Sequence, residues 1–290
     1  MKILVTGAEG RIGRNLPPLL LEAGHEVRTL DLVAHKGKAD WEHIPGDLCD
    51  PFTVRRALQG VDAVIHAGAV PFDIGDSTHL MQINVNGTWN VLNGAMESGI
   101  ERVIYFSSIN AQGSVKGHWP CEYLPIDDNY PHHPATPYQL SKHLGEEMCR
   151  SFSERWGMVT LCIRPVWVWD PELLGWFRGG GMNDFDEQWK NEYWAYVDMR
   201  DLCDATLRCV TFNDFAPGAV KHDAFLISAD DTTSLVPSEE LVQRAYPTTP
   251  WRKGERAEYF ANNPHRSLID CSHAKTTLGW QPKYSWKDEK

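Results

Sequence analysis

Residues 2–13 read Lys-Ile-Leu-Val-Thr-Gly-Ala-Glu-Gly-Arg-Ile-Gly. A short apolar run ends in three glycines, Gly7, Gly10 and Gly13, and an amphipathic pattern follows. This pattern predicts a buried parallel strand, a tight turn and the start of a helix. The N-terminus of a helix carries unpaired N–H groups and partial positive charge, so it can hold a pyrophosphate. Gly7 would make the turn, Gly10 would let the backbone approach the phosphates, and Gly13 would let helix and strand pack closely.

The composition is typical of a globular protein, with 42% hydrophobic and 23% charged residues among 290. The net charge of −11 argues against a nucleic-acid partner and against an anionic membrane surface. The chain enters a core strand at once and contains no long apolar run, so we expect neither a signal peptide nor a membrane span. Seven scattered cysteines without a CxxC pair indicate reduced, mostly buried thiols and a cytoplasmic protein.

Apolar runs and amphipathic stretches alternate through the first 165 residues, which predicts βαβ units in a doubly wound parallel sheet of the Rossmann type, an α/β fold. The predicted strands are 2–6, 26–31, 62–66, 102–107 and 158–164, and the predicted helices are 11–23, 51–58, 78–98 and 136–156.

The sequence changes character after residue 165. Residues 166–192 are rich in Trp, Gly and Asp, with three glycines at 179–181, and we expect a mobile substrate loop there. Residues 196–207 resume a strand and then a helix, which we expect back in the main sheet, and a short helix is expected near 272–278. The predicted domains are an NAD-binding domain at 1–165 with 193–228 returning to it, and a small substrate-binding cap formed by 166–192 and 229–290.

Further residues suit a dinucleotide site. Asp31 ends the second predicted strand, about twenty residues beyond the glycines, where a carboxylate accepts hydrogen bonds from an adenosine ribose and repels a 2′-phosphate. No arginine follows it directly, so NAD is favoured over NADP. Asp47 follows a third apolar stretch and could meet the adenine amino group, beside Leu48. The small residues 67–69, Ala-Gly-Ala, end the next strand, where a cofactor needs room.

A second constellation suits redox chemistry. The strand at 102–107 runs into Ser108, and thirty residues later Tyr138-Gln-Leu-Ser-Lys142 opens a helix. Tyr138 and Lys142 lie one turn apart on one helical face. A phenol has a pKa of about 10, and a nearby ammonium lowers it. Tyr138 could then take a proton from a substrate hydroxyl while hydride leaves the same carbon, with Ser108 polarising the oxygen.

These motifs resemble, in order, those of the extended short-chain dehydrogenases/reductases, the NAD-dependent epimerase/dehydratase superfamily. TGAEGRIG, Asp31, GDL, HAGA, NVNGT, FSS and YQLSK carry the resemblance from residue 1 to about 165, and YVDMRDLCDA and LGWQPKYSW continue it weakly.

The resemblance implies further roles. Asn84 matches the helix asparagine that shapes the active site, so the implied catalytic residues are Ser108, Tyr138, Lys142 and Asn84. Pro165 falls where a loop contacts the nicotinamide. The implied NAD site comprises Gly7, Gly10, Arg11, Ile12, Gly13, Asp31, Asp47, Leu48, Ala67, Gly68, Ala69, Tyr138, Lys142 and Pro165. The helices at 78–98 and 136–156 correspond to the dimer helices of the superfamily, so a homodimer is expected.

The sequence departs from nucleotide-sugar enzymes of this superfamily in two places. Trp167 stands where they carry an asparagine, and Asn191-Glu-Tyr-Trp194 replaces a segment with an arginine that neutralises the diphosphate. A diphosphate without cations loses charge-assisted hydrogen bonds. Tryptophan faces suit sugar rings. These departures favour a small sugar or sugar acid, as in the compact uronate dehydrogenases, and the candidate substrate residues are Ser107, Ser108, Trp167, Trp169 and Arg178.

Three functions stay open at this point. The first is an NAD-dependent dehydrogenase of a sugar-like alcohol, the second a nucleotide-sugar epimerase or dehydratase with tightly bound NAD, and the third a non-catalytic dinucleotide sensor. We expect no metal site, because His132 and His133 lack convergent ligands and no HExxH pattern surrounds His143 and Glu146. His143 and Glu146 are expected on the surface of a dimer helix. The substrate, its stereochemistry and the exchange of NAD are not fixed by the sequence.

Overall fold

The structure, a computed structural model, describes residues 1–178 and 189–287, and the side chain of Arg178 lies outside the described residues. The chain forms two compact units, each built from three stretches. The first unit contains Met1–Ser107, Ala135–Ile163 and Thr206–Ala224, and the second contains Ser108–Pro134, Arg164–Ala205 and Phe225–Lys290.

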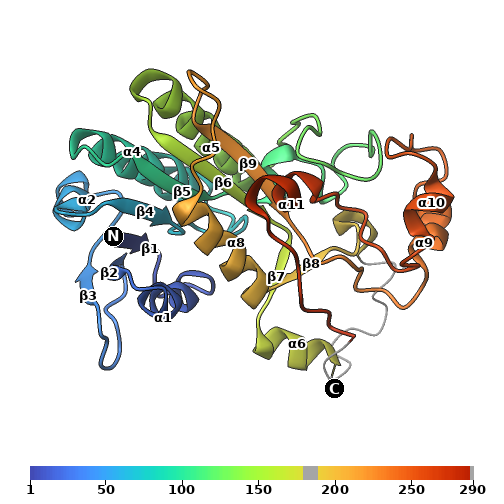
Figure 1. Cartoon of the computed structure of the whole chain (residues 1–290), viewed down its shortest axis with the longest axis horizontal. Helices are drawn as coiled ribbons and strands as arrows, with labels where there is room; N and C mark the ends of the chain where they lie inside the picture. The colour runs from blue at the N-terminus through green and yellow to red at the C-terminus, as the bar shows by residue number, and fades with distance from the viewer. Residues whose placement is uncertain (179–188, 288–290) are drawn as a thin grey trace. The chain divides into compact units, whose positions relative to one another are not determined.

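A seven-stranded sheet with the order β3-β2-β1-β4-β5-β6-β9 has most of its residues in the first unit, and the last residues of β6 and β9 belong to the second (Figure 1). Its strands are β1 (Lys2–Thr6), β2 (Glu26–Asp31), β3 (Glu42–Pro45), β4 (Ala63–His66), β5 (Arg102–Phe106), β6 (Val159–Pro165) and β9 (His222–Ile227). Pairing is parallel from β3 through to β6. The strand order reverses between β1 and β4, which is where doubly wound sheets bind their ligands. The predicted Rossmann architecture is confirmed.

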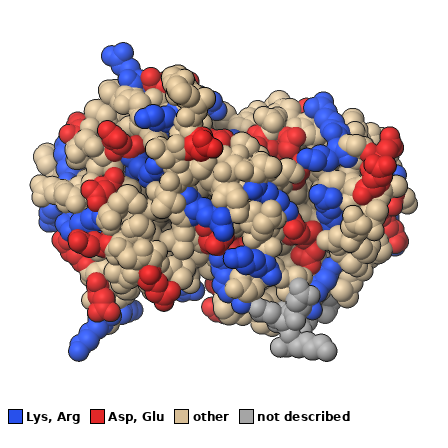
Figure 2. Space-filling view, in the orientation of Figure 1, with Lys and Arg blue, Asp and Glu red and all other residues tan. Residues whose placement is uncertain are grey.

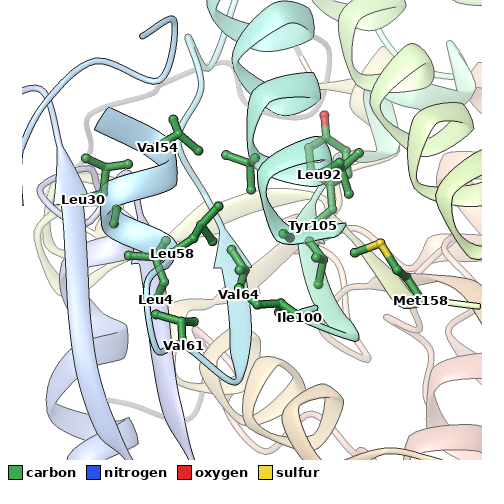
Figure 3. Packing of buried hydrophobic residues seen from close by; sticks show 14 of the residues in the cluster. Leu4, Leu30, Val54, Leu58, Val61, Val64, Leu92, Ile100, Tyr105 and Met158 are labelled. Carbon is green, nitrogen blue, oxygen red and sulfur yellow. The ribbon is translucent and has the colours of Figure 1, made fainter. Parts of the chain in front are cut away.

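The strands of this sheet are apolar because both faces are covered. Figure 1 shows α2 (Pro51–Leu58), α4 (Thr88–Glu97) and α5 (Pro137–Trp156) on one face and α1 (Leu16–Glu22) on the other. Figure 3 shows part of the core under the first group, a buried cluster to which Leu58 of α2, Leu92 of α4 and Val64 of β4 all belong. The core therefore fixes the strand ends that carry the candidate site.

Two predicted helices take a modified form. The predicted helix 11–23 begins as a short 3₁₀ segment, η1 (Gly13–Asn15), and α1 accommodates Pro17 and Pro18 in its first turn. The predicted helix 78–98 is continuous but contains a π-helical stretch, η2 (Gln82–Gly87), between α3 (Ser77–Met81) and α4. Single π-helical turns are frequent at functional sites, and this one holds Asn84.

The second unit corrects two expectations. Its elements are η3 (Ile109–Gln112), β7 (Trp167–Trp169), α6 (Pro171–Arg178), η4 (Lys190–Glu192), β8 (Tyr196–Asp198), α9 (Ser238–Ala245), α10 (Arg256–Phe260) and α11 (Ser272–Leu278), and α8 (Met199–Thr211) runs from this unit into the first. The strand expected to rejoin the main sheet, β8, pairs with β7 in a separate two-stranded sheet. The stretch expected to be a loop holds β7 and α6, while residues 179–188 lie outside the described residues. The short helix expected near 272–278 is confirmed.

Aromatic packing explains why β8 leaves the main sheet. Tyr196 of β8 packs on Trp169 of β7, with ring centroids 4.7 Å apart, and both side chains are buried. Phe177 of α6 and Trp286 complete the same cluster. The seventh position of the main sheet goes to β9, whose last three residues are fully buried and apolar.

The surface and the cysteines add two observations. Basic and acidic side chains are interspersed over the face shown in Figure 2. No helix in the described ranges is long and apolar enough to cross a membrane. Five of the seven cysteines are buried, as the sequence predicts: Cys149, Cys162, Cys203, Cys209 and Cys271.

Candidate active site

The glycine loop after β1 is packed so tightly that it leaves no room for side chains. Gly7 adopts a left-handed φ of +67°, and a Cβ there would lie 2.5 Å from the Cα of Gly68. A Cβ on Gly13 would lie 2.0 Å from the carbonyl oxygen of Gly7. The loop closes with a hydrogen bond from the Gly10 N–H to that same oxygen. The bare backbone of this turn, followed by the start of a helix, fits a pyrophosphate.

The carboxylate of Asp31 is fixed at the end of β2 beside this loop. One of its oxygens accepts a hydrogen bond from the N–H of Glu9 and the other accepts one from the N–H of Val33, each at 2.9 Å. His35 lies 2.7 Å from a carboxylate oxygen of Glu9. An acid held here suits a ribose with free hydroxyls and disfavours a 2′-phosphate.

The end of β4 forms the facing wall. Gly68 is buried, and a Cβ on it would lie 2.5 Å from the side chain of Leu48, so the chain needs glycine there. Ala67 and Ala69 flank it and are partly buried. Asp47 is exposed, and its carboxylate accepts a hydrogen bond from the N–H of Cys49, as in a turn aspartate. The role of Asp47 toward adenine stays a prediction.

Helix α5 is anchored at the turn that carries Tyr138. Thr136 caps the helix, its hydroxyl accepting from the N–H of Gln139, and the Gln139 side chain accepts from the N–H of Thr136. Asp73 adds a further cap by accepting from the N–H of Tyr138 at 2.9 Å. Such capping boxes satisfy the N–H groups that a helix start leaves unpaired. The first turn of α5 is therefore held firmly where the candidate base sits.

Lys142 lies one turn below Tyr138, and its ammonium is buried. Its Nζ donates to the carbonyl oxygen of Phe106 at 2.7 Å and lies 6.0 Å from the ring centroid of Tyr138. The ring centroid of Tyr105 lies 5.1 Å from the same Nζ. Burial lowers the pKa of Lys142 to about 8, while the Glu146 carboxylate opposes that shift. The arrangement places a titratable cation next to the candidate phenol.

Asn84, in the π-helical turn, connects the loop at Val70 to α5 by hydrogen bonds. Its side-chain oxygen accepts from the N–H of Val70 at 2.7 Å, and its amide donates to the Val70 carbonyl and to the Ser141 hydroxyl, both at 3.0 Å. Ser141 in turn donates to the carbonyl of Tyr138. Asn84 is buried, so all its polar atoms are satisfied within the protein. The predicted active-site asparagine thus positions α5.

His66, at the end of β4, is held as a neutral ring. The Thr88 hydroxyl donates to the Asn84 carbonyl, so it accepts from Nε2–H of His66 at 3.0 Å. Nδ1 then accepts from the hydroxyl of Thr6 at 2.6 Å. Burial, and to a lesser degree the nearby Lys142 cation, lowers the pKa of His66 to about 3. This histidine carries no charge at neutral pH.

Glu146 lies in a different position from the one that the sequence predicts. It was expected on the surface, but only 1% of it is exposed, and it accepts a hydrogen bond from Oγ of Ser107 at 2.5 Å. It lies one turn beyond Lys142, so the i, i+4 spacing on a helix that buries Ser141, Lys142 and Gly145 could have revealed it. The hydroxyl of Ser107, a candidate substrate contact, is directed at this carboxylate.

Arg11 and Ile12 follow Gly10 in the first unit, whereas Ser108, Pro165, Trp167 and Trp169 belong to the second. Ser108 follows β5 and caps η3, its hydroxyl accepting from the N–H of Asn110. Pro165 ends β6. Trp167 is half-buried and stacks on Trp189 with centroids 4.4 Å apart, whereas Trp169 is 1% exposed within the aromatic core. The structure therefore brings Tyr138, Lys142 and Asn84 together in the first unit, and places Ser108 where the chain enters the second.

Comparison with known proteins extends these observations. The sequence model of the NAD dependent epimerase/dehydratase family matches residues 3–172. A putative UDP-glucose 4-epimerase of Methanocaldococcus jannaschii is 31% identical over 99% of this chain and 95% of its own length. A 2-alkyl-3-oxoalkanoate reductase of Stenotrophomonas maltophilia is 34% identical over 84% of this chain and 74% of its own. A uronate dehydrogenase of Pseudomonas syringae is 32% identical over 56% of this chain.

The chain spans 58% of the length of that uronate dehydrogenase. Among solved structures, a short-chain dehydrogenase/reductase superfamily protein from Agrobacterium tumefaciens with bound NAD superposes with a TM-score of 0.73 at 24% identity, over 99% of this chain and 94% of that one. This likeness confirms the fold. The family model covers more than half of the chain, and the bare glycine cradle fits a dinucleotide. The chain therefore belongs to the NAD dependent epimerase/dehydratase family, and NAD is its cofactor.

Proposed function

We propose that this protein is an NAD-dependent oxidoreductase that transfers hydride between a sugar-like alcohol, a free sugar or sugar acid, and NAD. The observation that carries the proposal is the buried Lys142 ammonium, 6.0 Å from the ring of Tyr138 on an anchored helix. Bound NAD supplies the hydride acceptor. Tyr138, Lys142 and Ser108 would act on the proton and oxygen of the substrate.

The chemistry of the chain's own residues follows from their charges. A cation beside a phenol stabilises the phenolate and lowers its pKa, so Tyr138 can act as a base near neutral pH. Its phenolate oxygen would take the proton of the substrate hydroxyl, and Ser108 would hold the same oxygen by a hydrogen bond. Lys142 would also bind a ribose hydroxyl of the cofactor. Asn84 keeps the helix at the required position.

The ion pair next to the segment 191–194 supports a substrate without a diphosphate. Lys116 adjoins the segment that replaces the arginine-bearing one, and its ammonium lies 2.6 Å from the carboxylate of Glu192. That cation is already neutralised. Trp167 and Trp189 offer aromatic faces in the same unit, which suits a sugar ring.

A second candidate is a nucleotide-sugar 4-epimerase or dehydratase that keeps NAD bound and returns the hydride. The near full-length match to the putative UDP-glucose 4-epimerase favours it. Net formation of NADH separates the two functions, because an epimerase consumes and restores its NAD within one turnover.

The test is absorbance of NADH with purified protein, added NAD and a panel of free sugars, sugar acids and nucleotide sugars. A 3-hydroxyalkanoate belongs in the panel because one relative is a 2-alkyl-3-oxoalkanoate reductase. NADH formed from a sugar or sugar acid supports the proposal. Stereochemical change of a nucleotide sugar without NADH would establish the epimerase instead, and NAD binding without any turnover would leave a dinucleotide sensor.

We also infer a homodimer through α4 and α5. Trp89 on α4 and Trp156 on α5 are both nearly half exposed, and the ring of Phe152 lies between them, 5.4 Å and 4.7 Å away. Large apolar side chains exposed on adjoining helices indicate an interface. All seven cysteines are thiols, and we infer the cytoplasm as the compartment that keeps them reduced.

A further inference from the structure

We propose that Glu146 is a positioning residue that keeps the ammonium of Lys142 charged, and that Ser107 holds the Glu146 carboxylate in place for this purpose. The inference rests on the proposed function, in which the Lys142 cation stabilises the Tyr138 phenolate. The structure gives the Glu146 carboxylate a specific buried partner, the hydroxyl of Ser107.

The burial of Glu146 is the first step of the argument. A carboxylate with 1% exposure loses its hydration and must be compensated by hydrogen bonds and an opposite charge. The hydroxyl of Ser107 supplies a short hydrogen bond of 2.5 Å. Lys142, four residues earlier on α5, supplies the opposite charge from the same helical face.

The other titratable groups around Lys142 come from the strands beneath it and from its own helix. Tyr105 lies on β5, His66 on β4 and Cys162 on β6, with Tyr138 one turn above on α5. His66 is neutral, and burial raises the pKa of Tyr105 well above its usual value. Among these described neighbours Glu146 is the carboxylate, so it supplies the negative charge.

The charge of Glu146 matters because two opposing effects set the pKa of Lys142. Burial lowers the pKa of Lys142 to about 8, and the Glu146 carboxylate is the largest influence in the opposite direction. A pKa of about 8 is close to the pH at which a cytoplasmic enzyme works. Removal of the carboxylate would therefore leave much of Lys142 as neutral amine, unable to stabilise a phenolate.

The direct test is an NMR titration of Lys142 in full-length protein labelled with ¹³C at lysine Cε, the resonance being assigned by its loss in Lys142→Met. In Glu146→Gln, an isostere that still accepts from Ser107, the titration midpoint should fall by about one pH unit or more, a tenfold change in proton affinity. Glu146→Asp retains the charge and should restore the midpoint. Glu147→Gln, the same change at the exposed neighbouring position, should leave it unaltered.

An unchanged midpoint in Glu146→Gln, or an equal shift in Glu147→Gln, would overturn the proposal. If Glu146→Gln does not fold, the ¹³C resonance of the Glu146 carboxyl decides in the unmodified protein. This resonance must report an ionised carboxylate at pH 7. Its titration midpoint must move to higher pH in Ser107→Ala, because loss of a hydrogen bond to the charged form disfavours that form. A protonated carboxyl at pH 7 would refute the inference.

These readouts do not depend on turnover, so they separate the two proposals. Activity that survives in Tyr138→Phe would end the proposed function while leaving the Lys142 titration intact. Conversely, an active dehydrogenase whose Lys142 midpoint ignores Glu146 would retain the function and reject the positioning role. In the active enzyme, Glu146→Gln should shift the pH profile of kcat, which a purely structural role would not move.

Discussion

Gly13→Ala probes the cofactor cradle because it adds a single methyl group where the backbone is most crowded. The new Cβ would lie 2.0 Å from the carbonyl oxygen of Gly7 and 2.9 Å from the Cα of Ala8. Ordinary contact begins at 3.4 Å, so the loop or the helix start must move by about 1.4 Å. Gly13 has no left-handed φ, so the effect is steric rather than a loss of backbone freedom.

A shift of this size is large compared with the tolerance of a hydrogen bond. N–H···O bonds span about 2.7–3.2 Å, so displaced N–H groups would lose contact with a phosphate. Each hydrogen bond to a charged group contributes about 1.5–3 kcal/mol, and the loss of one weakens NAD binding by about tenfold to a hundredfold. Overpacking of the first turn should also destabilise the fold by roughly 1–3 kcal/mol.

Isothermal titration calorimetry with NAD and thermal unfolding without it measure the two effects. The matched control is Gly175→Ala, on an exposed site of α6 where an added Cβ meets nothing within 4 Å. This control should keep its NAD affinity, and its helix should gain up to about 1 kcal/mol. The steric reasoning fails if Gly13→Ala binds NAD and melts like the control.

Four further outcomes are expected. Tyr138→Phe should lower turnover by about a hundredfold or more with NAD affinity unchanged in calorimetry, since only the proton acceptor is lost; retained turnover would contradict it. Asn84→Ala removes three hydrogen bonds of a buried side chain and should lower the free energy of unfolding in urea by about 2–3 kcal/mol, and a loss below 1 kcal/mol would contradict the role of Asn84 in holding α5. His66 stays neutral in the folded protein down to about pH 3, whereas its ordinary pKa of 6.5 applies to the unfolded chain, so the free energy of unfolding should fall as the pH drops below 6.5, by about 2 kcal/mol at pH 5. His66→Gln should flatten that slope. Trp89→Glu with Trp156→Glu should turn a dimer into a monomer in light scattering, and a persistent dimer would place the interface elsewhere.

The main sheet and the glycine turn after β1 could be predicted because their signals are local. A buried parallel strand reads as an apolar run, and the turn after β1 requires glycine for steric reasons that the spacing of Gly7, Gly10 and Gly13 already indicates. The Tyr138 and Lys142 pair follows from helical periodicity alone. Each of these features needs only a few neighbouring residues to be recognised.

The predictions that are wrong concern features that depend on contacts between residues far apart in the sequence. The pairing of β8 with β7 follows from aromatic packing of Tyr196 on Trp169, which a linear pattern does not contain. The burial of Glu146 depends on Ser107, thirty-nine residues earlier in the chain. A single charged residue on an amphipathic helix is usually exposed, so the i, i+4 spacing could place Glu146 on the face of Lys142, but the contact with Ser107 is needed to explain its burial.

The hydrogen bonds that anchor α5 do not involve the aromatic residues that are proposed to contact the substrate. Asp73 caps the turn of Tyr138, Asn84 ties the helix to the loop at Val70, and Ser107 holds Glu146, so side chains from several segments of the first unit fix one helix. The proposed proton acceptor Tyr138 and the side chains that hold its helix therefore lie in the same unit as the glycine turn after β1. The aromatic cluster around Trp167 belongs to the second unit and shares none of these hydrogen bonds. Under the proposed function, substitutions in that cluster should alter which alcohol is bound while the Lys142 titration stays the same, which is the separation that an enzyme family with one chemistry and many substrates requires.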